Sequence, residues 1–406
     1  MTYKSLAKWL IISFSGLLLI YIGVLTIAFM IPDSLLMEKW TESVNLIASE
    51  EKRWVVMTGL EATKLDTFTD NLMFQRLLNR EGINPLSAAM WVDGYTRYWL
   101  GILAVLRPLL LFVSYEGIRY FNIFFILGLL CFVFSAVKKH LGKTFSTAFL
   151  FSMGMIHVWI FPLSLQYTTA YAVMMIATLF LFYLYEKKLL DGKRDIIFFF
   201  IVGSVTNFFD LLTVPLITFG IPYTLYFCLK NKDKIQSFKE NILYTIRSGI
   251  SWLAGYALTW SAKWIIGSII LQENIIKSAL NQILFRSGAE EEVPIVMSDV
   301  YRSLIDLMFP SYMVKVLLIV GVVWIIYFLI HHKSWKNILN LSPVLLIGIL
   351  PYVWFFALSN HNLHHDYFTY RNQAITTLVF LSFMLLSVNK TNAPRWIMKI
   401  KKKYMK

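Results

Sequence analysis

Charged residues are scarce in this chain of 406 residues. They make up 15% of it, whereas hydrophobic residues make up 57% and the mean hydropathy is +0.61. Many apolar runs approach the roughly 20 residues that a helix needs to cross a bilayer. This composition argues against soluble enzyme folds and predicts an all-α polytopic membrane protein, with one integral membrane domain over residues 1–406. The net charge of +14 is therefore not taken as a sign of nucleic-acid binding.

Cysteine is nearly absent as well, and both copies, Cys131 and Cys228, fall in apolar runs. A disulfide framework or a cysteine metal site is therefore not expected. The sequence also has no HExxH motif, internal repeat or low-complexity run. The first apolar run is longer than the core of a signal peptide and no small-residue cleavage site follows it, so we expect a retained helix.

The apolar segments predict about ten membrane-spanning helices. They lie at residues 9–31, 117–137, 144–164, 170–186, 195–209, 214–229, 246–267, 313–330, 340–358 and 373–388. A cytoplasmic N-terminus would place most lysines, with the basic tail 389–406, on one face of the membrane. Because short cytoplasmic loops carry the excess of Lys and Arg, we expect both termini in the cytoplasm.

This topology leaves two long loops on the outer face, residues 32–116 and 268–312. Loops of this length are uncommon unless they have a function of their own or are disordered, and their many apolar residues argue against disorder. The segment from Tyr98 to Val113 is apolar but contains Arg107-Pro108. If it crossed the membrane, every later loop would change sides, so we expect interfacial or re-entrant helices in the first outer loop.

Arginine is concentrated on the predicted outer face, which topology alone does not explain. Arg107, Arg119 and Arg371 lie against apolar segments. The planar guanidinium binds phosphate or carboxylate through two parallel hydrogen bonds and tolerates partial burial. The pattern favours an outward-facing site for an anionic ligand such as a lipid phosphate, and ion pairing with the outer acids is the alternative.

A pair of acids stands in the first outer loop. Asp66 and Asp70 are four residues apart, so they share one face of a helix. Paired carboxylates can act as a general base with an orienting partner, or can bind a divalent cation. The alternative is a helix start, in which Thr67 or Thr69 is the N-cap and acids are favoured in the first turn.

Two further polar groups stand at predicted outer boundaries. Asn207 and Asp210 are one helical turn apart at the end of the fifth span. An acid there faces either a polar cavity or outer water. The stretch 360–371 contains His361 and His365, whose spacing of four also occurs in zinc sites. A proton relay or hydrogen bonding to a sugar or phosphate is favoured over a metal, and interfacial histidines are the alternative.

Five of these segments resemble recurring motifs of bacterial polytopic membrane proteins with the layout of GT-C glycosyltransferases. The segments are Asp66–Asp70, Tyr95–Gly101, Leu106–Leu110, Asn207–Thr213 and Asn360–Arg371. A long first outer loop with an aspartate, followed by many spans, belongs to the same pattern. The resemblance implies a general base at Asp70, with Asp66 second. About 35 residues separate the first span from Asp66, which keeps Asp33 as a further choice.

The resemblance implies a transferase in the cell membrane, the bacterial plasma membrane, that moves a sugar from a polyprenyl-phosphate donor to a glycan or lipid acceptor on the outer face. No cofactor is expected beyond a divalent cation at Asp66 and Asp70. A polysaccharide polymerase or ligase, a flippase and a non-catalytic assembly partner are the alternatives. The expected donor-phosphate contacts are Arg371, Arg107, His361 and His365. The expected cavity-lining residues are Asn207, Asp210, Tyr370 and Arg97.

Overall fold

The computed structural model describes residues 2–79, 82–91, 94–289, 295–309, 312–331 and 334–387, and this part of the chain is helical without a named strand. The predicted basic tail 389–406 lies outside it. The α-helices are α1 (Tyr3–Phe29), α2 (Asp33–Ser49), α3 (Thr67–Gln75), α4 (Pro85–Met90), α5 (Leu103–Leu109), α6 (Tyr115–Leu141), α7 (Lys143–Gly154), α8 (Leu165–Glu186), α9 (Arg194–Phe209), α10 (Ile217–Asn231), α11 (Phe238–Leu271), α12 (Ile275–Ser287), α13 (Met297–Met308), α14 (Tyr312–His331), α15 (Trp335–Leu341), α16 (Leu345–Ala357), α17 (Ser359–His364), α18 (Asp366–Thr369) and α19 (Ala374–Ser387). The short 3-10 helices are η1 (Glu61–Thr63), η2 (Val158–Leu163), η3 (Ser342–Val344) and η4 (Tyr370–Gln373).

Four helical segments in the described residues are long and apolar enough to cross a membrane: Tyr3–Phe29, Tyr115–Leu141, Leu165–Glu186 and Trp335–Ala357. They confirm an all-helical chain that is compatible with a membrane protein. The other segments predicted to span are largely helical as well, but they do not belong to these four. The count of ten spans and the orientation of the termini therefore stay predictions.

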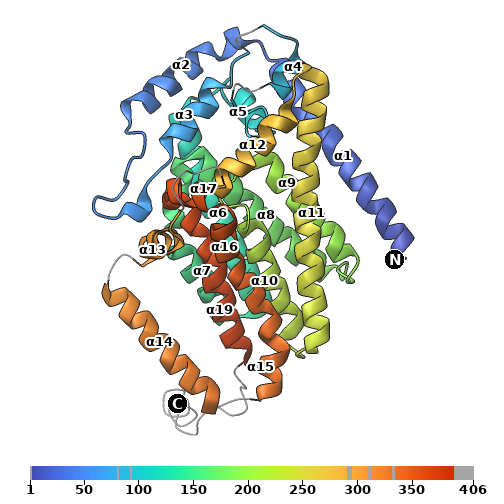
Figure 1. Ribbon diagram of the computed structural model, residues 1–406, viewed down its shortest axis with the longest axis vertical. Coiled ribbons are helices and arrows are strands. Elements are labelled where there is room, and N and C mark those ends of the chain that lie inside the picture. The colour runs from blue at the N-terminus through green and yellow to red at the C-terminus, as the bar shows by residue number, and fades with distance from the viewer. Residues whose placement is uncertain are drawn as a thin grey trace.

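The two predicted outer loops contain helices of their own. The first carries α2 to α5 and the second carries α12 and α13. Figure 1 shows α2 to α5, α12 and α17 at one end of a bundle whose long helices run toward the other end. The apolar segment after Tyr98 forms only the seven-residue helix α5, which is far too short to span a bilayer.

The bundle packs around two apolar cores. One gathers side chains of α7, α8, α10 and α19, and the other joins α1, α4 and α5 to the segment 95–101. Helices α9 and α11 approach most closely, because Gly203 of α9 faces Trp252 and Gly255 of α11 faces Phe200. A Cβ atom at either glycine would overlap a main-chain carbonyl of the opposite helix. Small residues at such a crossing let two helix backbones come together.

Candidate functional site

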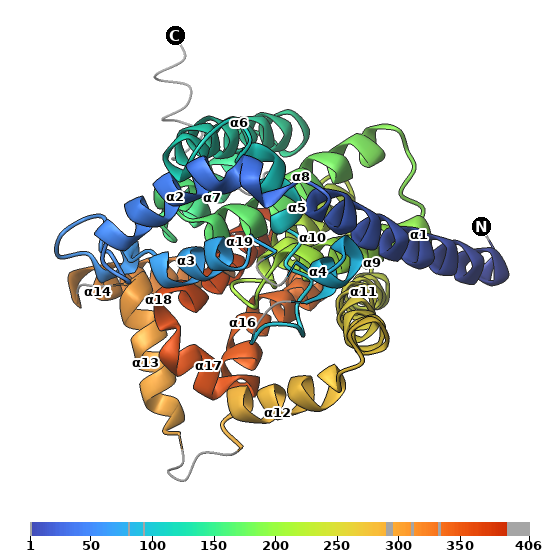
Figure 2. The same ribbon diagram turned by 90° about the horizontal axis from the view of Figure 1, so that it is seen from above.

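The motifs selected from the sequence converge at the end of the bundle that carries the loop helices. Gly101 donates its N–H to the carbonyl of Phe208 (2.9 Å), and His361 lies 3.0 Å from the carbonyl of Leu212. Arg371 reaches the carbonyl of Ala62, 309 residues earlier (3.1 Å). Figure 2, which views this end from above, shows α3, α12, α13 and α17 around it. The convergence gathers the candidate residues of four distant segments.

Asp70 is fully buried and is held by donors from two other helices. The Tyr115 hydroxyl donates to its carboxylate at 2.5 Å, and the Ser164 hydroxyl and Leu165 N–H donate at 3.2 Å each. Leu165 begins α8, so Asp70 lies at the N-terminus of a 22-residue helix, where a negative charge is favoured. Burial nevertheless raises the pKa of Asp70 to about 7, and the Tyr115 hydrogen bond opposes this rise.

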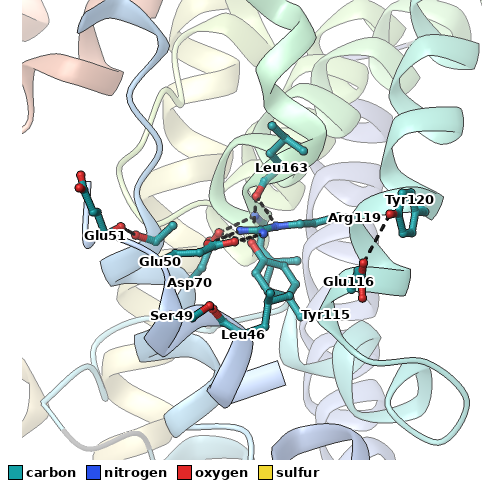
Figure 3. A network of polar contacts seen from close by, with 12 residues as sticks. Leu46, Ser49, Glu50, Glu51, Asp70, Tyr115, Glu116, Arg119, Tyr120 and Leu163 are labelled. Atoms are coloured by element: carbon teal, nitrogen blue, oxygen red, sulfur yellow. Dashed lines mark hydrogen bonds and ion pairs between the residues drawn. The ribbon is translucent and has the colours of Figure 1, made fainter. Parts of the chain in front are cut away.

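An ion pair holds Tyr115 in place. Both terminal nitrogens of Arg119 donate to the carboxylate of Glu50, at the end of α2, and its Nε donates to the carbonyl of Leu163 (2.9 Å). The guanidinium lies over the ring of Tyr115, 4.2 Å from its centre. Figure 3 shows this group facing Asp70, whereas Glu116 and Tyr120 form a separate pair on the same helix. Arg119 thus ties three segments together around the Asp70 donor.

Asp66 is buried too, but it acts as the N-cap of α3. Its two oxygens accept from the N–H and the hydroxyl of Thr69, at 3.1 and 2.6 Å. Burial raises the pKa of Asp66, while Thr69 and the charge of Arg53 oppose the rise. A helix therefore starts here, as the alternative expected, and Asp70 lies in its first turn. The N-cap is Asp66, however, and the expectation of Thr67 or Thr69 at that position was wrong.

Arg371 is fully buried, and its guanidinium binds main-chain carbonyls. It donates to the carbonyls of Tyr367 (2.9 Å), Ala62 (3.1 Å) and Ile156 (3.3 Å). The guanidinium carbon lies 4.3 Å from the ring centre of Tyr167. The Tyr370 hydroxyl donates to the same Ala62 carbonyl (3.0 Å). Both side chains therefore fasten the segment that precedes Asp66 to the C-terminal motif.

Arg107 is placed in a similar way at another helix end. It donates to the carbonyl of Ala28 in the last turn of α1 (2.8 Å) and to that of Ile31 just beyond it (2.5 Å), and it pairs with Asp33 (2.8 Å). A cation at a helix C-terminus satisfies carbonyls that the helix leaves without partners. Asp33 also accepts the Asn79 N–H (2.7 Å). The pair thus closes the turn between α1 and α2.

Asn207, Asp210 and Arg97 lie in a second polar group with residues that the sequence did not single out. Tyr256 of α11 has Asn207, Asp210, Tyr98 and Arg286 as its polar neighbours. The segment that carries Arg97 is fixed because Trp260 and Trp264 both donate to the Arg97 carbonyl, at 2.9 and 3.1 Å. A Cβ at Gly101 would overlap Phe208, so this segment requires glycine where it meets α9.

Beside this group, Asp210 is hydrogen-bonded by the main chain, and His361 and His365 are neutral. Asp210 accepts the N–H groups of Leu212 (2.8 Å) and Thr213 (3.1 Å), and burial raises its pKa to about 7. The rings of His361 and His365 lie 4.9 Å apart. Burial and the nearby charge of Arg286 lower the pKa of both histidines, so both are uncharged at neutral pH.

No group of three or more His, Cys, Asp or Glu side chains that could hold a metal ion occurs within the described ranges. Asp66 and Asp70 direct their oxygens at hydroxyl and N–H donors. Such donors occupy the lone pairs that a divalent cation would need. The arrangement fits hydrogen-bonded carboxylates better than metal ligands.

An apolar groove in the bundle shares one residue with the surroundings of Asp70. Its volume is about 270 Å³, and its wall is formed by α5, α6, α8 and Phe209. Leu165, whose N–H donates to Asp70, is part of this wall. A second groove of about 470 Å³ between α8 and α9 shares Val173, Ile176 and Phe209 with the first. Together they extend as far as Arg194, at the opposite end of α9.

Comparison with known proteins finds no family model, no curated protein and no solved structure that matches the chain.

Proposed function

We propose that the chain is a polytopic membrane glycosyltransferase. It moves a sugar from a polyprenyl-phosphate donor to a cell-envelope glycan or lipid acceptor on the outer face of the bacterial plasma membrane. In this proposal the shorter apolar helices span as well, which gives ten crossings with both termini in the cytoplasm. The end of the bundle with α2 to α5, α12 and α17 then faces outward and carries all the candidate residues.

The observation that carries the proposal is the position of Asp70 against the apolar groove. Leu165 joins the two, since its side chain lines the groove and its N–H donates to the Asp70 carboxylate (3.2 Å). An isoprenoid chain in the groove would be sheltered from water, and its polar head would lie near the carboxylate. A lipid-linked substrate explains why a buried acid and a long apolar groove meet.

The proposed reaction uses Asp70 as general base. The acceptor hydroxyl attacks the anomeric carbon of the donor sugar, and its proton passes to the Asp70 carboxylate as the new glycosidic C–O bond forms. The bond between the anomeric carbon and the phosphate oxygen breaks, and its electron pair leaves with the polyprenyl phosphate. Attack from the opposite face inverts the anomeric centre. A base with a pKa near 7 suits this role at neutral pH.

The surroundings of the three candidate aspartates favour Asp70. Asp33 is occupied by Arg107, and both oxygens of Asp66 cap α3. Asp70 is the carboxylate that combines a pKa of about 7 with a place beside the groove. Because Asp70 has no exposed surface, substrate entry requires movement of the preceding segment, which Tyr370 and Arg371 hold through Ala62.

The test is sugar transfer by Asp70→Asn in membranes that contain a labelled lipid-linked sugar pool. We expect transfer to be lost while expression and membrane insertion persist, because the amide cannot take the acceptor proton. Asp306→Asn is the matched control, since Asp306 is half-exposed on α13 and pairs with Lys315. Full transfer by Asp70→Asn would refute the assignment of the base. Lipid and glycan analysis of a deletion strain would separate transfer from polymerisation and from flipping, because each leaves a different intermediate to accumulate.

A further inference from the structure

Arginine and tyrosine side chains alternate along one wall of the second polar group. The guanidinium carbon of Arg97 lies 5.1 Å from the ring centres of both Tyr95 and Tyr98, and that of Arg286 lies 5.7 Å from the centre of Tyr98. Tyr98 thus stands between two cations. Arg97 is only 7% exposed, so at least one of these charges is held away from bulk water.

Neither arginine forms an ion pair within the described residues. Arg97 donates from Nη1 to the carbonyl of Gly94 (2.8 Å). Asp210 neighbours Tyr256, but its oxygens accept main-chain N–H groups. Buried cations are normally paired with a carboxylate or another anion. Two buried or half-buried guanidiniums without such a partner indicate an anion that the described residues do not supply.

Within the described residues, four donors at this place have no hydrogen-bond partner. They are Nε of Arg97, Nη1 of Arg286 and the hydroxyls of Tyr98 and Tyr256. Tyr98 and Tyr256 are nine-tenths buried or more. An unsatisfied buried donor costs about 1–3 kcal/mol, and the cost is higher for a charged group. A cluster of such donors is the environment that a bound oxyanion requires.

We propose that Arg97, Arg286, Tyr98 and Tyr256 bind a phosphate ester, the phosphate group of the lipid-linked substrate. This rests on the proposed function, and it moves the phosphate contact away from the residues expected from the sequence. The guanidinium forks bind the phosphate oxygens through paired, charge-assisted hydrogen bonds, and the tyrosine hydroxyls donate to the remaining oxygens.

The position of the group relative to the apolar groove supports a lipid source for the phosphate. Ile102 and Phe209 both line the groove. Ile102 directly follows the segment 95–101, and Phe209 lies between Asn207 and Asp210. A chain that fills the groove would therefore bring its head group to the arginines. Arg371 and Arg107 cannot serve in this arrangement, since main-chain carbonyls and Asp33 occupy their guanidiniums.

The experiment measures binding of geranyl phosphate to the detergent-solubilised full chain by isothermal titration, with geraniol and inorganic phosphate as companion probes. We expect Arg286→Gln to weaken geranyl phosphate binding by about tenfold or more, because a charged hydrogen-bonding group is lost. Arg302→Gln is the matched control, because Arg302 is highly exposed on α13 and lies 3.9 Å from Asp306. Its binding should equal that of the wild type.

Tyr256→Phe is a second variant that separates a loss of binding from a loss of folding. It leaves the ring in place and removes a single hydroxyl, which has Asn207 as a polar neighbour among the described residues. The thermal stability should therefore change little, whereas geranyl phosphate binding should weaken several-fold. Unchanged affinity in both Arg286→Gln and Tyr256→Phe would overturn the site. Geraniol that binds as tightly as geranyl phosphate would overturn it as well, and inorganic phosphate of equal affinity would overturn the lipid source.

Failure of this site and failure of the proposed function give different results. Asp70→Asn should not weaken geranyl phosphate binding, because the Asp70 carboxylate donates no hydrogen bond to the phosphate. Sugar transfer that survives Asp70→Asn would refute the base without affecting the binding measurement. Conversely, unchanged binding in Arg286→Gln, with transfer lost in Asp70→Asn, would refute only the phosphate site.

Discussion

Tyr115→Phe removes the shortest hydrogen bond to the proposed base and leaves the ring in place. The Tyr115 hydroxyl donates to the Asp70 carboxylate at 2.5 Å, which stabilises the charged form. Such a bond to a charged group contributes about 1.5–3 kcal/mol, and about 1.4 kcal/mol corresponds to one pKa unit. Because the lost donor favoured the carboxylate, the pKa of Asp70 should rise from about 7 by roughly one to two units.

This shift has a defined effect on the rate. At pH 7 about half of Asp70 is ionised in the wild type, and roughly 1–10% would be ionised in the variant. Transfer at pH 7 should therefore fall by about 5- to 50-fold and should recover at higher pH, since a general base acts only when ionised. The acid limb of the pH–rate profile moves to higher pH by the same one to two units.

The assay is the pH dependence of sugar transfer by the purified variant. Tyr120→Phe on the same helix is the control, because the Tyr120 hydroxyl is exposed and lies 3.4 Å from Glu116. Its profile should match that of the wild type. An acid limb that does not move in Tyr115→Phe, or a rate that falls equally at every pH, would refute the link between this hydroxyl and the base.

Two further predictions concern packing. Arg371→Lys should lower the melting temperature by several degrees and leave geranyl phosphate binding unchanged, because one ammonium cannot reach the three carbonyls that the guanidinium binds; weaker binding with unchanged melting would instead make Arg371 a phosphate contact. Gly255→Ala should destabilise the protein by about 1–3 kcal/mol, since its Cβ would overlap Phe200. Gly249→Ala in the same helix meets only ordinary contacts, so equal melting temperatures of the two variants would contradict the close crossing of α9 and α11.

The helices were the part of the fold that the sequence predicts best. A run of apolar residues favours a helix whether or not it spans the membrane, because a chain in lipid must satisfy its own backbone groups. Every segment predicted to span is helical, although α7 ends at Gly154 and η2 follows it. The short helix α5 also agrees with its sequence, because Arg107 and Pro108 interrupt the apolar segment 98–113 near its middle.

The site was harder to predict, because the type of a residue does not show which distant residues it will contact in the fold. Tyr115 and Tyr256 lie in apolar helices, where a tyrosine gives no sign of which polar group it faces. Arg371 and Arg107 stand at boundaries, as a ligand-binding arginine would, but their neighbours turned out to be helix-end and loop carbonyls. The positions of such carbonyls depend on where the chain turns, and they cannot be read from the identities of the residues.

The contact between Arg371 and Ala62 has a consequence for how the molecule is made. The two residues are 309 positions apart, so nearly the whole chain must be synthesised before the segment ahead of Asp66 can take its final place. Contacts of such long sequence separation form late, because a long loop must close first. The carboxylate near the N-terminus would therefore become ordered only after the last helices have been made, and a chain that lacks them would expose residues 32–79 to proteases.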